Sequence, residues 1–208
     1  RPLIDGAKVY WGGKKMLNII KNRRSVRSFK AEQITDGELD CILEAACCSP
    51  SGHNAQPWFF TVIQNKEFID YISLKTKLVM TGSGNEKARR LGTSENYHVL
   101  HAAPTVIIVS GKTEKSVIDL PGYEFSSYSP LADCSAAIQN MLLAAESIGI
   151  GSCWVGFVNY FFALPEEAAK LKVPDNYRPL FAVCLGYKRN ETAMPLPVRK
   201  TDCVKYIR

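Results

Sequence analysis

The sequence lacks paired cysteines and a second pair of metal ligands. It has seven cysteines, an odd number with irregular spacing, and none of them forms a C-x-x-C motif. Such a set argues against a disulfide framework and favours free thiols in a reducing compartment, so we expect a cytoplasmic protein. His98 and His101 form a single H-x-x-H. Without a second ligand pair at suitable spacing, this pattern favours a polar helix face over a metal site.

Long apolar runs and long basic runs are also missing. No stretch approaches the roughly 18 apolar residues that a membrane span needs, and the first residues contain no signal-peptide core. The net charge is only +6, and the basic residues are scattered as short pairs. These pairs are Lys14-Lys15, Arg23-Arg24, Arg89-Arg90 and Arg199-Lys200. We therefore expect local anion sites, with neither a nucleic acid nor a membrane as partner.

Neither glycine-rich stretch completes a nucleotide-binding motif. Gly149-Ile150-Gly151 lacks the third glycine of the dinucleotide fingerprint and follows a predicted helix instead of a strand. The stretch 82–84, Gly-Ser-Gly, lacks the Lys-Ser/Thr of a phosphate loop. No residue has the sequence context of a nucleophile elbow or a thiol protease. The sequence therefore supports no Rossmann dehydrogenase, NTPase or triad hydrolase.

The pattern of apolar residues predicts one α+β domain over residues 1–208, with 1–15 and 190–208 as N- and C-terminal extensions. Strands are expected at 58–63, 105–110, 153–156 and 180–186. Helices are expected at 16–22, 36–48, 67–80, 86–101, 130–148 and 165–171. The T-x-x-E pattern at 35–38 is a capping box that opens the second of these helices.

A polar loop with the sequence SPSGHNAQPW, residues 49–58, leads directly into the apolar strand 58–63. Turn chemistry accounts for its Gly, Pro, Ser and Asn. It does not account for Gln56 or for the length of the loop. His53 is the one histidine in the loop, and a lone imidazole there is more often a hydrogen-bonding group than a general base. The loop is therefore a candidate binding element.

A second candidate is a basic cluster. Arg23, Arg24, Ser25 and Arg27 place three guanidinium groups and a hydroxyl within five residues. Arginine stays charged and donates hydrogen bonds in a rigid fork, so the cluster suits a dianionic phosphate. Taken alone, it is equally compatible with a solvated basic turn after a helix. The pair at 199–200 near the other end of the chain could complete an anion site.

Taken together, these motifs resemble the FMN-dependent nitroreductase family, whose members oxidise NAD(P)H. The resemblance rests on RRSVRSF at 23–29, PSGHNAQPW at 50–58, GIGSCW at 149–154 and LGY at 185–187, in this order. It covers residues 16–200, and R-R-S-x-R followed by P-S-x-x-N-x-Q-P-W is its most specific part. It implies a central, mainly antiparallel sheet wrapped by helices. It also implies an intertwined homodimer with two FMN sites, each built from both chains.

The resemblance also assigns the residues that would bind FMN. The ribityl phosphate and the flavin edge would be bound by Arg23, Arg24, Ser25 and Arg27, with Arg199 and Lys200 closing the phosphate site. A loop from the partner chain would pack against the isoalloxazine through Pro50, Ser51, Gly52 and Asn54, with Gln56 supporting it. The ring would be lined by Asn96 at its polar edge and by Trp154, Val155 and Gly156 beside N5.

The activity that the resemblance implies needs no catalytic side chain, because hydride passes from NADH or NADPH to flavin N5. An electron-poor acceptor such as a nitroaromatic or a quinone then takes the same place, in a ping-pong sequence. Val155 stands where some relatives carry an acidic residue, which puts the backbone in the N5 role. Relatives that reduce free flavin or dehalogenate a substrate imply other acceptors, and a non-catalytic flavin-binding module is a further alternative. The aromatic-rich connection 111–128 is expected to decide among them.

Overall fold

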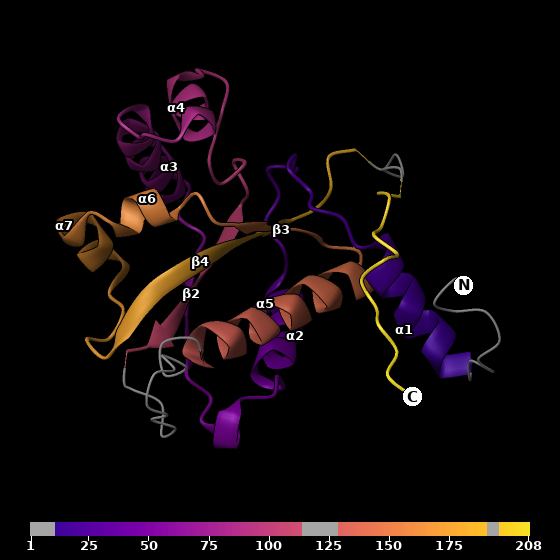
Figure 1. Cartoon of the computed structure of the whole chain (residues 1–208). Helices are drawn as coiled ribbons and strands as arrows, with labels where there is room; N and C mark the ends of the chain where they lie inside the picture. Colours follow the sequence, from indigo (N-terminus) through magenta and orange to yellow (C-terminus); the bar gives the residue numbers. More distant parts are fainter. Residues whose placement is uncertain (1–10, 114–128, 191–195) are drawn as a thin grey trace.

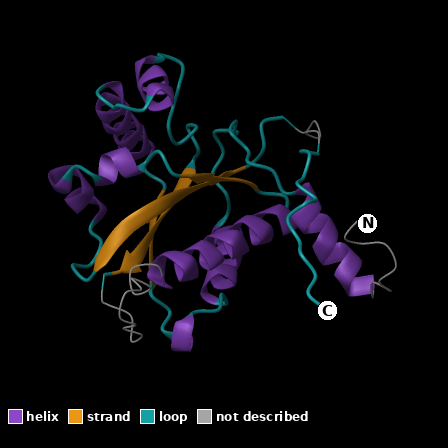
Figure 2. Ribbon diagram, viewed as in Figure 1, coloured by secondary structure: helices purple, strands orange, loops and turns teal. Residues whose placement is uncertain are grey.

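A four-stranded antiparallel sheet forms the centre of the computed structural model, which describes residues 11–113, 129–190 and 196–208 (Figures 1 and 2). The strands lie in the order β1-β2-β4-β3. Their bounds are Trp58–Ile63 for β1, Thr105–Lys112 for β2, Gly151–Val155 for β3 and Tyr177–Gly186 for β4. Each neighbouring pair is antiparallel, which confirms the predicted α+β class and sheet.

Helices cover both faces of this sheet (Figure 1). One face is covered by α2 (Asp36–Cys47) and α5 (Ser129–Ser147). The other face is covered by α3 (Lys66–Thr81), α4 (Glu86–Thr93), α6 (Asn159–Phe162) and α7 (Pro165–Ala168). A further helix, α1 (Trp11–Asn22), leads into the edge of the sheet. None of the described helices combines the length and the apolar character that a membrane span requires.

The central strand β2 shows why both faces need a cover. Val106 and Ile108 belong to the core on the α3 and α6 side, whereas Ile107 and Val109 belong to the core on the α2 and α5 side. All of them are fully buried. Successive side chains of a strand face opposite sides of the sheet, so a strand covered on both faces is apolar throughout.

Residues 23–30, which we call the edge segment, extend the sheet beside β3. Ser25 forms a parallel bridge to Ser152, and the Val26 amide donates to the Ser152 carbonyl at 2.9 Å. Further on, Phe29 forms an antiparallel bridge to Lys188, just past the end of β4. These backbone pairings fix the position of the basic cluster relative to the sheet.

The segment 94–104 differs from the sequence prediction. The apolar spacing predicts one helix over 86–101, but α4 ends at Thr93. His101 and Ala102 then adopt left-handed backbone conformations, with φ of 56° and 48°. The physical reason is that side chains accept the backbone N–H groups of this segment and so satisfy them outside a helix. The other expected elements are present with shifted ends.

The capping box at the start of α2 forms as the sequence predicts. Thr35 Oγ1 accepts from the Glu38 amide at 3.3 Å, and the Glu38 carboxylate accepts from the Thr35 amide at 2.8 Å. The Tyr187 hydroxyl donates to the same carboxylate at 2.8 Å. These bonds hold the pKa of Glu38 below its usual value, the bond from the Thr35 backbone contributing most. They also attach the first turn of α2 to the end of β4.

Thr35→Ala is expected to lower the free energy of unfolding by about 1 kcal/mol, because the first turn of α2 loses its side-chain acceptor. Urea denaturation should show a lower midpoint with an unchanged slope. Asp40→Ala, at an exposed position of the same helix, serves as the control. An equal loss of stability in the control would contradict the capping role of Thr35.

Candidate functional site

The edge segment brings two of its arginines close to β3. Burial raises the pKa of the Cys153 thiol, and the guanidinium groups of Arg27 and Arg23 both oppose that rise. Arg27 is exposed and Arg23 is half-buried. Ser25 is also half-buried, and its backbone carbonyl accepts from Arg27 Nη1 at 3.4 Å. The structure therefore gathers Arg23, Ser25 and Arg27 at one edge of the sheet.

Arg24 points in a different direction from its neighbours. Its Nη1 donates to the Lys21 carbonyl at 2.7 Å and to the Arg23 carbonyl at 2.9 Å. These bonds place its charge at the C-terminal end of α1, where a cation is favourable for the helix dipole. Arg24 Nε is buried and has no hydrogen-bond partner among the described residues. A buried donor on a permanent cation is a group that an anionic ligand at this edge would stabilise.

The end of β3 offers backbone groups at the site. The Trp154 ring packs edge-on against Phe181 at 5.0 Å between centroids, within the core on the α2 and α5 side. Val155 is buried, whereas Gly156 is exposed, and a Cβ added there would meet no atom within 4 Å. The Gly156 carbonyl accepts from Asn159 Nδ2 at 2.9 Å, which fixes the turn. Gly156, which has no side chain, is therefore the exposed backbone just after β3.

The segment after α4 forms a further side of the site, and sequence reasoning found only one of its residues. Asn96 is exposed and adjoins Tyr97, whose ring contacts the His101 ring edge-on at 6.4 Å between centroids. Burial raises the pKa of Tyr97 and lowers that of His101 to about 4; the charge of Arg27 moves both pKa values down. The sequence feature that could have pointed to His101 is the H-x-x-H motif, but this pattern favours a polar helix face.

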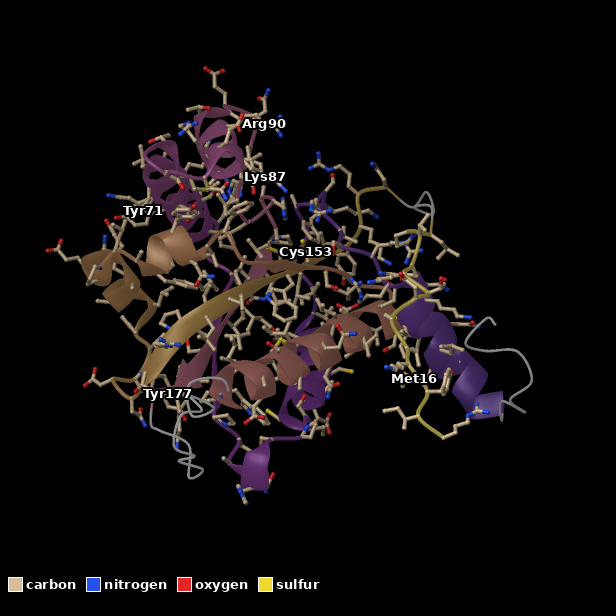
Figure 3. The ribbon with its side chains drawn as sticks, viewed as in Figure 1. Met16, Tyr71, Lys87, Arg90, Cys153 and Tyr177 are labelled. Carbon is tan, nitrogen blue, oxygen red and sulfur yellow. The ribbon has the colours of Figure 1, made fainter. Side chains whose placement is uncertain are left out.

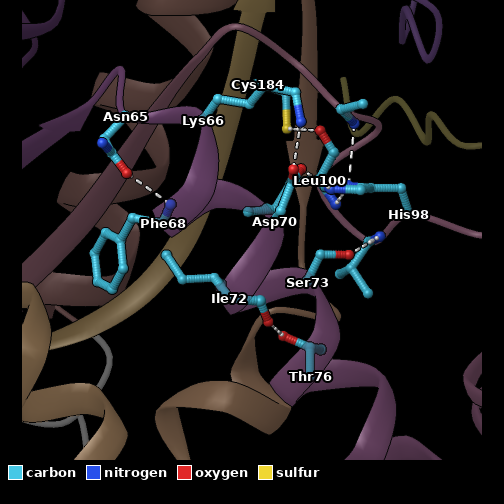
Figure 4. Close-up of polar contacts among 12 residues, drawn as sticks. Asn65, Lys66, Phe68, Asp70, Ile72, Ser73, Thr76, His98, Leu100 and Cys184 are labelled. Carbon is cyan, nitrogen blue, oxygen red and sulfur yellow. Dashed lines mark hydrogen bonds and ion pairs between the residues drawn. The ribbon is translucent and has the colours of Figure 1, made fainter.

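A hydrogen-bond network from α3 holds this segment in place (Figure 4). His98 Nδ1 accepts from the amides of Leu100 at 3.2 Å and Ala102 at 3.0 Å, and His98 Nε2 lies 3.1 Å from Asp70 Oδ1. Because Nδ1 accepts, the proton of the neutral ring lies on Nε2 and is donated to Asp70. Ser73 Oγ accepts from the Val99 amide at 2.9 Å. His98 is thus a structural residue. Among the described residues, no group of three or more His, Cys, Asp or Glu side chains could hold a metal ion.

Lowering the pH from about 6.5 to about 4.5 is expected to destabilise the protein by roughly 1–3 kcal/mol. The folded-state pKa of His101 is about 4, below its unfolded value, so the unfolded chain takes up the proton first. Its contribution is therefore complete above the unfolded pKa and is lost as the pH falls toward the folded one. The pKa of His98 is lowered as well. Among carboxylates with lowered pKa values, Glu38 and Glu167 begin to lose their contribution only near the lower end of this window, and Asp70 loses it below the window.

Thermal unfolding at several pH values checks this dependence. His101→Asn is the variant to compare, because asparagine tolerates the left-handed backbone of this position. The variant should lose less stability than the wild type across the same window. Identical pH profiles would show that His101 does not carry the effect.

The polar loop between α2 and β1 is anchored on α5. Asn140 Nδ2 donates to Ser49 Oγ at 2.8 Å, and the Gly52 amide lies 3.4 Å from Asp133 Oδ2. Within the loop, the Gln56 amide donates to Ser51 Oγ at 3.0 Å. Gln56 therefore supports the loop through its backbone.

Three non-glycine residues of this loop have left-handed backbone angles. They are His53, Asn54 and Gln56, with φ of 51°, 55° and 46°. Such conformations cost free energy and cluster at ligand sites and switch regions. Pro50 and the three residues are exposed, and Ser51 is half-buried. The loop is thus strained, anchored at both ends and open at its surface.

The polar loop and the edge segment do not meet within one chain. The loop follows the C-terminal end of α2, whereas the N-terminal end of α2 bonds to Tyr187, next to the bridge of Phe29 to Lys188. A helix of 12 residues separates these ends by roughly 18 Å. Figure 1 shows them at opposite ends of α2 and α5. The structure therefore brings together the edge segment, β3 and the segment after α4, but not the loop.

The remaining two predicted residues lie on the C-terminal tail. Arg199 and Lys200 are exposed, and the tail 196–208 contains no helix or strand. Lys200 Nζ lies 3.9 Å from Asp202 Oδ1, at the limit of an ion pair. Their assignment to the phosphate site stays a prediction.

The sheet and the edge segment define an α+β protein that presents anion-binding groups at a sheet edge. The chain belongs to the nitroreductase family: the model of the Nitroreductase family matches residues 20–187. The family predicted from the sequence is thereby confirmed.

Three relatives illustrate the match. The chain is similar to the crystal structure of a nitroreductase with bound FMN from Bacteroides fragilis NCTC 9343. The sequence identity is 32% and the TM-score 0.78, with 93% of this chain and 98% of that chain covered. A protein of Archaeoglobus fulgidus with the provisional name NADH dehydrogenase/NAD(P)H nitroreductase is 31% identical over 175 residues, 84% of this chain and 86% of its own. The FMN reductase (NADPH) of Bacillus subtilis is 26% identical over 178 residues, 84% of this chain and 66% of its own.

Proposed function

We propose that this chain is an FMN-dependent oxidoreductase that takes electrons from NADH or NADPH and passes them to an electron-poor acceptor, in a ping-pong sequence. The observation that carries the proposal is the edge segment, which the bridge of Ser25 to Ser152 holds beside β3. Arg23 and Arg27 lie near Cys153 of β3, and Gly156 is exposed just after that strand. The FMN-bound relative and the NADPH-dependent relative support the cofactor and the electron donor.

The residues present fit FMN. Arg23 and Arg27 would bind the phosphate and the flavin edge by charge-assisted hydrogen bonds. Arg24 bonds to the end of α1, and its buried Nε has no hydrogen-bond partner among the described residues. FMN, when bound, supplies the transfer of hydride from the nicotinamide to the acceptor. The arginines also provide a cationic environment that favours negative charge at the site.

We propose that each site is completed by a second copy of the chain. The polar loop is strained and open, yet it lies at the far end of α2 from the edge segment of its own chain. In a homodimer, the loop of one chain can reach the edge segment of the other. Residues 50–54 would then contact the flavin, while Asn140 holds the loop in place. The whole chain would form one FMN-binding domain, with 190–208 reaching the partner.

A spectroscopic experiment tests the proposal. Purified protein should show the visible absorption bands of flavin, and anaerobic NADPH or NADH should bleach them. A quinone or a nitroaromatic should then restore the bands without further donor, as a ping-pong sequence requires. Protein that takes up no FMN on reconstitution would contradict the cofactor assignment. Flavin-loaded protein that neither nucleotide reduces would be a binding module and not a reductase.

Free flavin is a second candidate acceptor. The similarity to an FMN reductase (NADPH) favours it, although that relative is longer than this chain. The connection 111–128 was expected to decide the acceptor, but its residues 114–128, which include Tyr123, Phe125 and Tyr128, lie outside the described residues. The comparison of turnover with added FMN, a quinone and a nitroaromatic separates these classes. Such an enzyme would work in the cytoplasm, the compartment that the free cysteines favour.

A further inference from the structure

α4 presents a basic surface that the proposed function has not used. Three of its eight residues are basic: Lys87, Arg89 and Arg90. Arg89 Nη1 donates to the Ser83 carbonyl at 3.3 Å. Lys87 and Arg90 are exposed, and in the part of the chain that the structure describes neither forms an ion pair. Residues three apart share one helix face, so both side chains lie on the same side of α4; both residues are labelled in Figure 3.

The core side of α4 fixes this surface rigidly on α3. Ala88 and Gly92 are buried, and a Cβ added at Gly92 would lie 2.8 Å from the Thr81 amide. The first turn is capped by Asn85 Oδ1, which accepts from the Ala88 amide at 3.0 Å. A helix attached so closely holds the Cα atoms of Lys87 and Arg90 in a defined position. The two cationic side chains therefore extend from fixed positions and can reach one anionic group on a ligand.

α4 is connected directly to the proposed flavin site. The chain passes from the end of α4 into the segment of Asn96, Tyr97 and His101, and Arg27 lies near the last two of these. Arg27, like Lys87 and Arg90, has no carboxylate partner among the described residues. Positive charge without a described carboxylate partner is therefore present both on the edge segment and on α4, which ends at Thr93, three residues before Asn96.

We propose that Lys87 and Arg90 bind the 2′-phosphate of NADPH and so make NADPH the preferred electron donor. This inference rests on the proposed function. A ribose 2′-phosphate carries close to two negative charges at neutral pH and offers three acceptor oxygens, whereas NADH has a neutral hydroxyl at that position. Arginine binds such a group through its fork and lysine binds it as a point charge. A dinucleotide whose nicotinamide lies over the flavin extends its adenosine end out of the site, and α4 is the basic helix that leads into the segment of Asn96.

Steady-state kinetics of the FMN-loaded protein test the preference. The wild type should have a lower KM for NADPH than for NADH, with a quinone as acceptor. The double variant Lys87→Ala/Arg90→Ala should raise the KM for NADPH by about ten-fold or more, while the KM for NADH changes by less than about two-fold. Its kcat and its FMN content should be unchanged, because neither side chain touches the flavin. Arg178→Ala, an exposed arginine on β4 next to Tyr177 at the other end of the molecule, is the matched control (Figure 3).

A binding measurement without turnover separates this inference from the proposed function. Adenosine 2′,5′-bisphosphate should bind the FMN-loaded wild type at least about ten-fold more tightly than 5′-AMP in calorimetric titration, and the double variant should lose this difference. Added salt should weaken the binding of the bisphosphate more than the binding of the monophosphate.

Each outcome decides one of the two proposals. Equal KM values for NADPH and NADH in the wild type, or a double variant that affects both equally, would overturn the role of α4. A double variant that still binds the bisphosphate more tightly than 5′-AMP would also overturn the role of α4. Flavin-loaded protein that no nicotinamide reduces would overturn the proposed function, and the titration would still decide whether α4 binds a 2′-phosphate.

Discussion

Replacing Arg23 and Arg27 together by alanine is expected to weaken FMN binding by at least roughly a hundred-fold. A hydrogen bond to a charged group is worth about 1.5–3 kcal/mol, so each arginine accounts for roughly ten-fold or more. Arg27 is exposed, and its described hydrogen bond is one weak contact to the Ser25 carbonyl at 3.4 Å. The loss should therefore appear in cofactor binding and not in folding. Quenching of flavin fluorescence on titration, together with the flavin-to-protein absorbance ratio, measures it.

Two further variants make this result specific. Arg27→Lys keeps the charge but not the fork, so it should retain part of the affinity. Arg178→Ala removes an exposed positive charge from β4 and should leave FMN binding unchanged. Unchanged FMN binding in the double variant would contradict the assignment of the edge segment as the phosphate site.

The second large effect concerns the apolar surface of the C-terminal tail. Val198 is 100% exposed and Ile207 is 92% exposed, and Met16 on α1 is also exposed. Side chains of this size normally lie against other residues, and burying one contributes about 1.5–3 kcal/mol. Val198→Asp/Ile207→Asp should therefore raise the dissociation constant of the proposed homodimer by roughly a hundred-fold or more. Because the site would need both chains, FMN should be lost together with the dimer.

Sedimentation at several protein concentrations measures the oligomeric state. The matched control is Leu74→Asp, which places the same charge on an apolar side chain of α3 that is 56% exposed. It should leave the dimer and its FMN intact. Wild-type protein that holds FMN as a monomer, or a double variant that stays dimeric, would contradict a site completed through the tail.

Local sequence signals predicted the elements that local physics controls. Thr35 and Glu38 predicted the start of α2, because a capping box needs only residues within one turn. The continuous apolar run of β2 predicted a strand buried on both faces. By contrast, the segment after α4 is held by bonds to Asp70 and Ser73, which are distant in sequence and lie on α3. The spacing of apolar residues does not reflect such bonds, so it predicts a helix over 86–101 that is longer than α4.

The candidate site also contains some residues that the sequence predicts and others that it does not. The basic cluster at 23–27 and the polar loop at 49–58 could be found from residue types and their spacing alone. That Tyr97 and His101 lie near Arg27 could not be found, since residues some 70 positions apart come together only when the edge segment pairs with β3. The different direction of Arg24 likewise follows from its bonds to the end of α1.

The sequence by itself determined the family, the α+β class, the order of most elements and the chemistry of the residues that could hold an anion. These depend on side-chain type and on short spacings, which the chain carries whatever its conformation. Only the tertiary structure decided that the polar loop lies a helix length away from the edge segment, and that Tyr97 and His101 lie near Arg27. Distances between residues far apart in sequence are set by how helices and strands pack, and that packing depends on all of their contacts together.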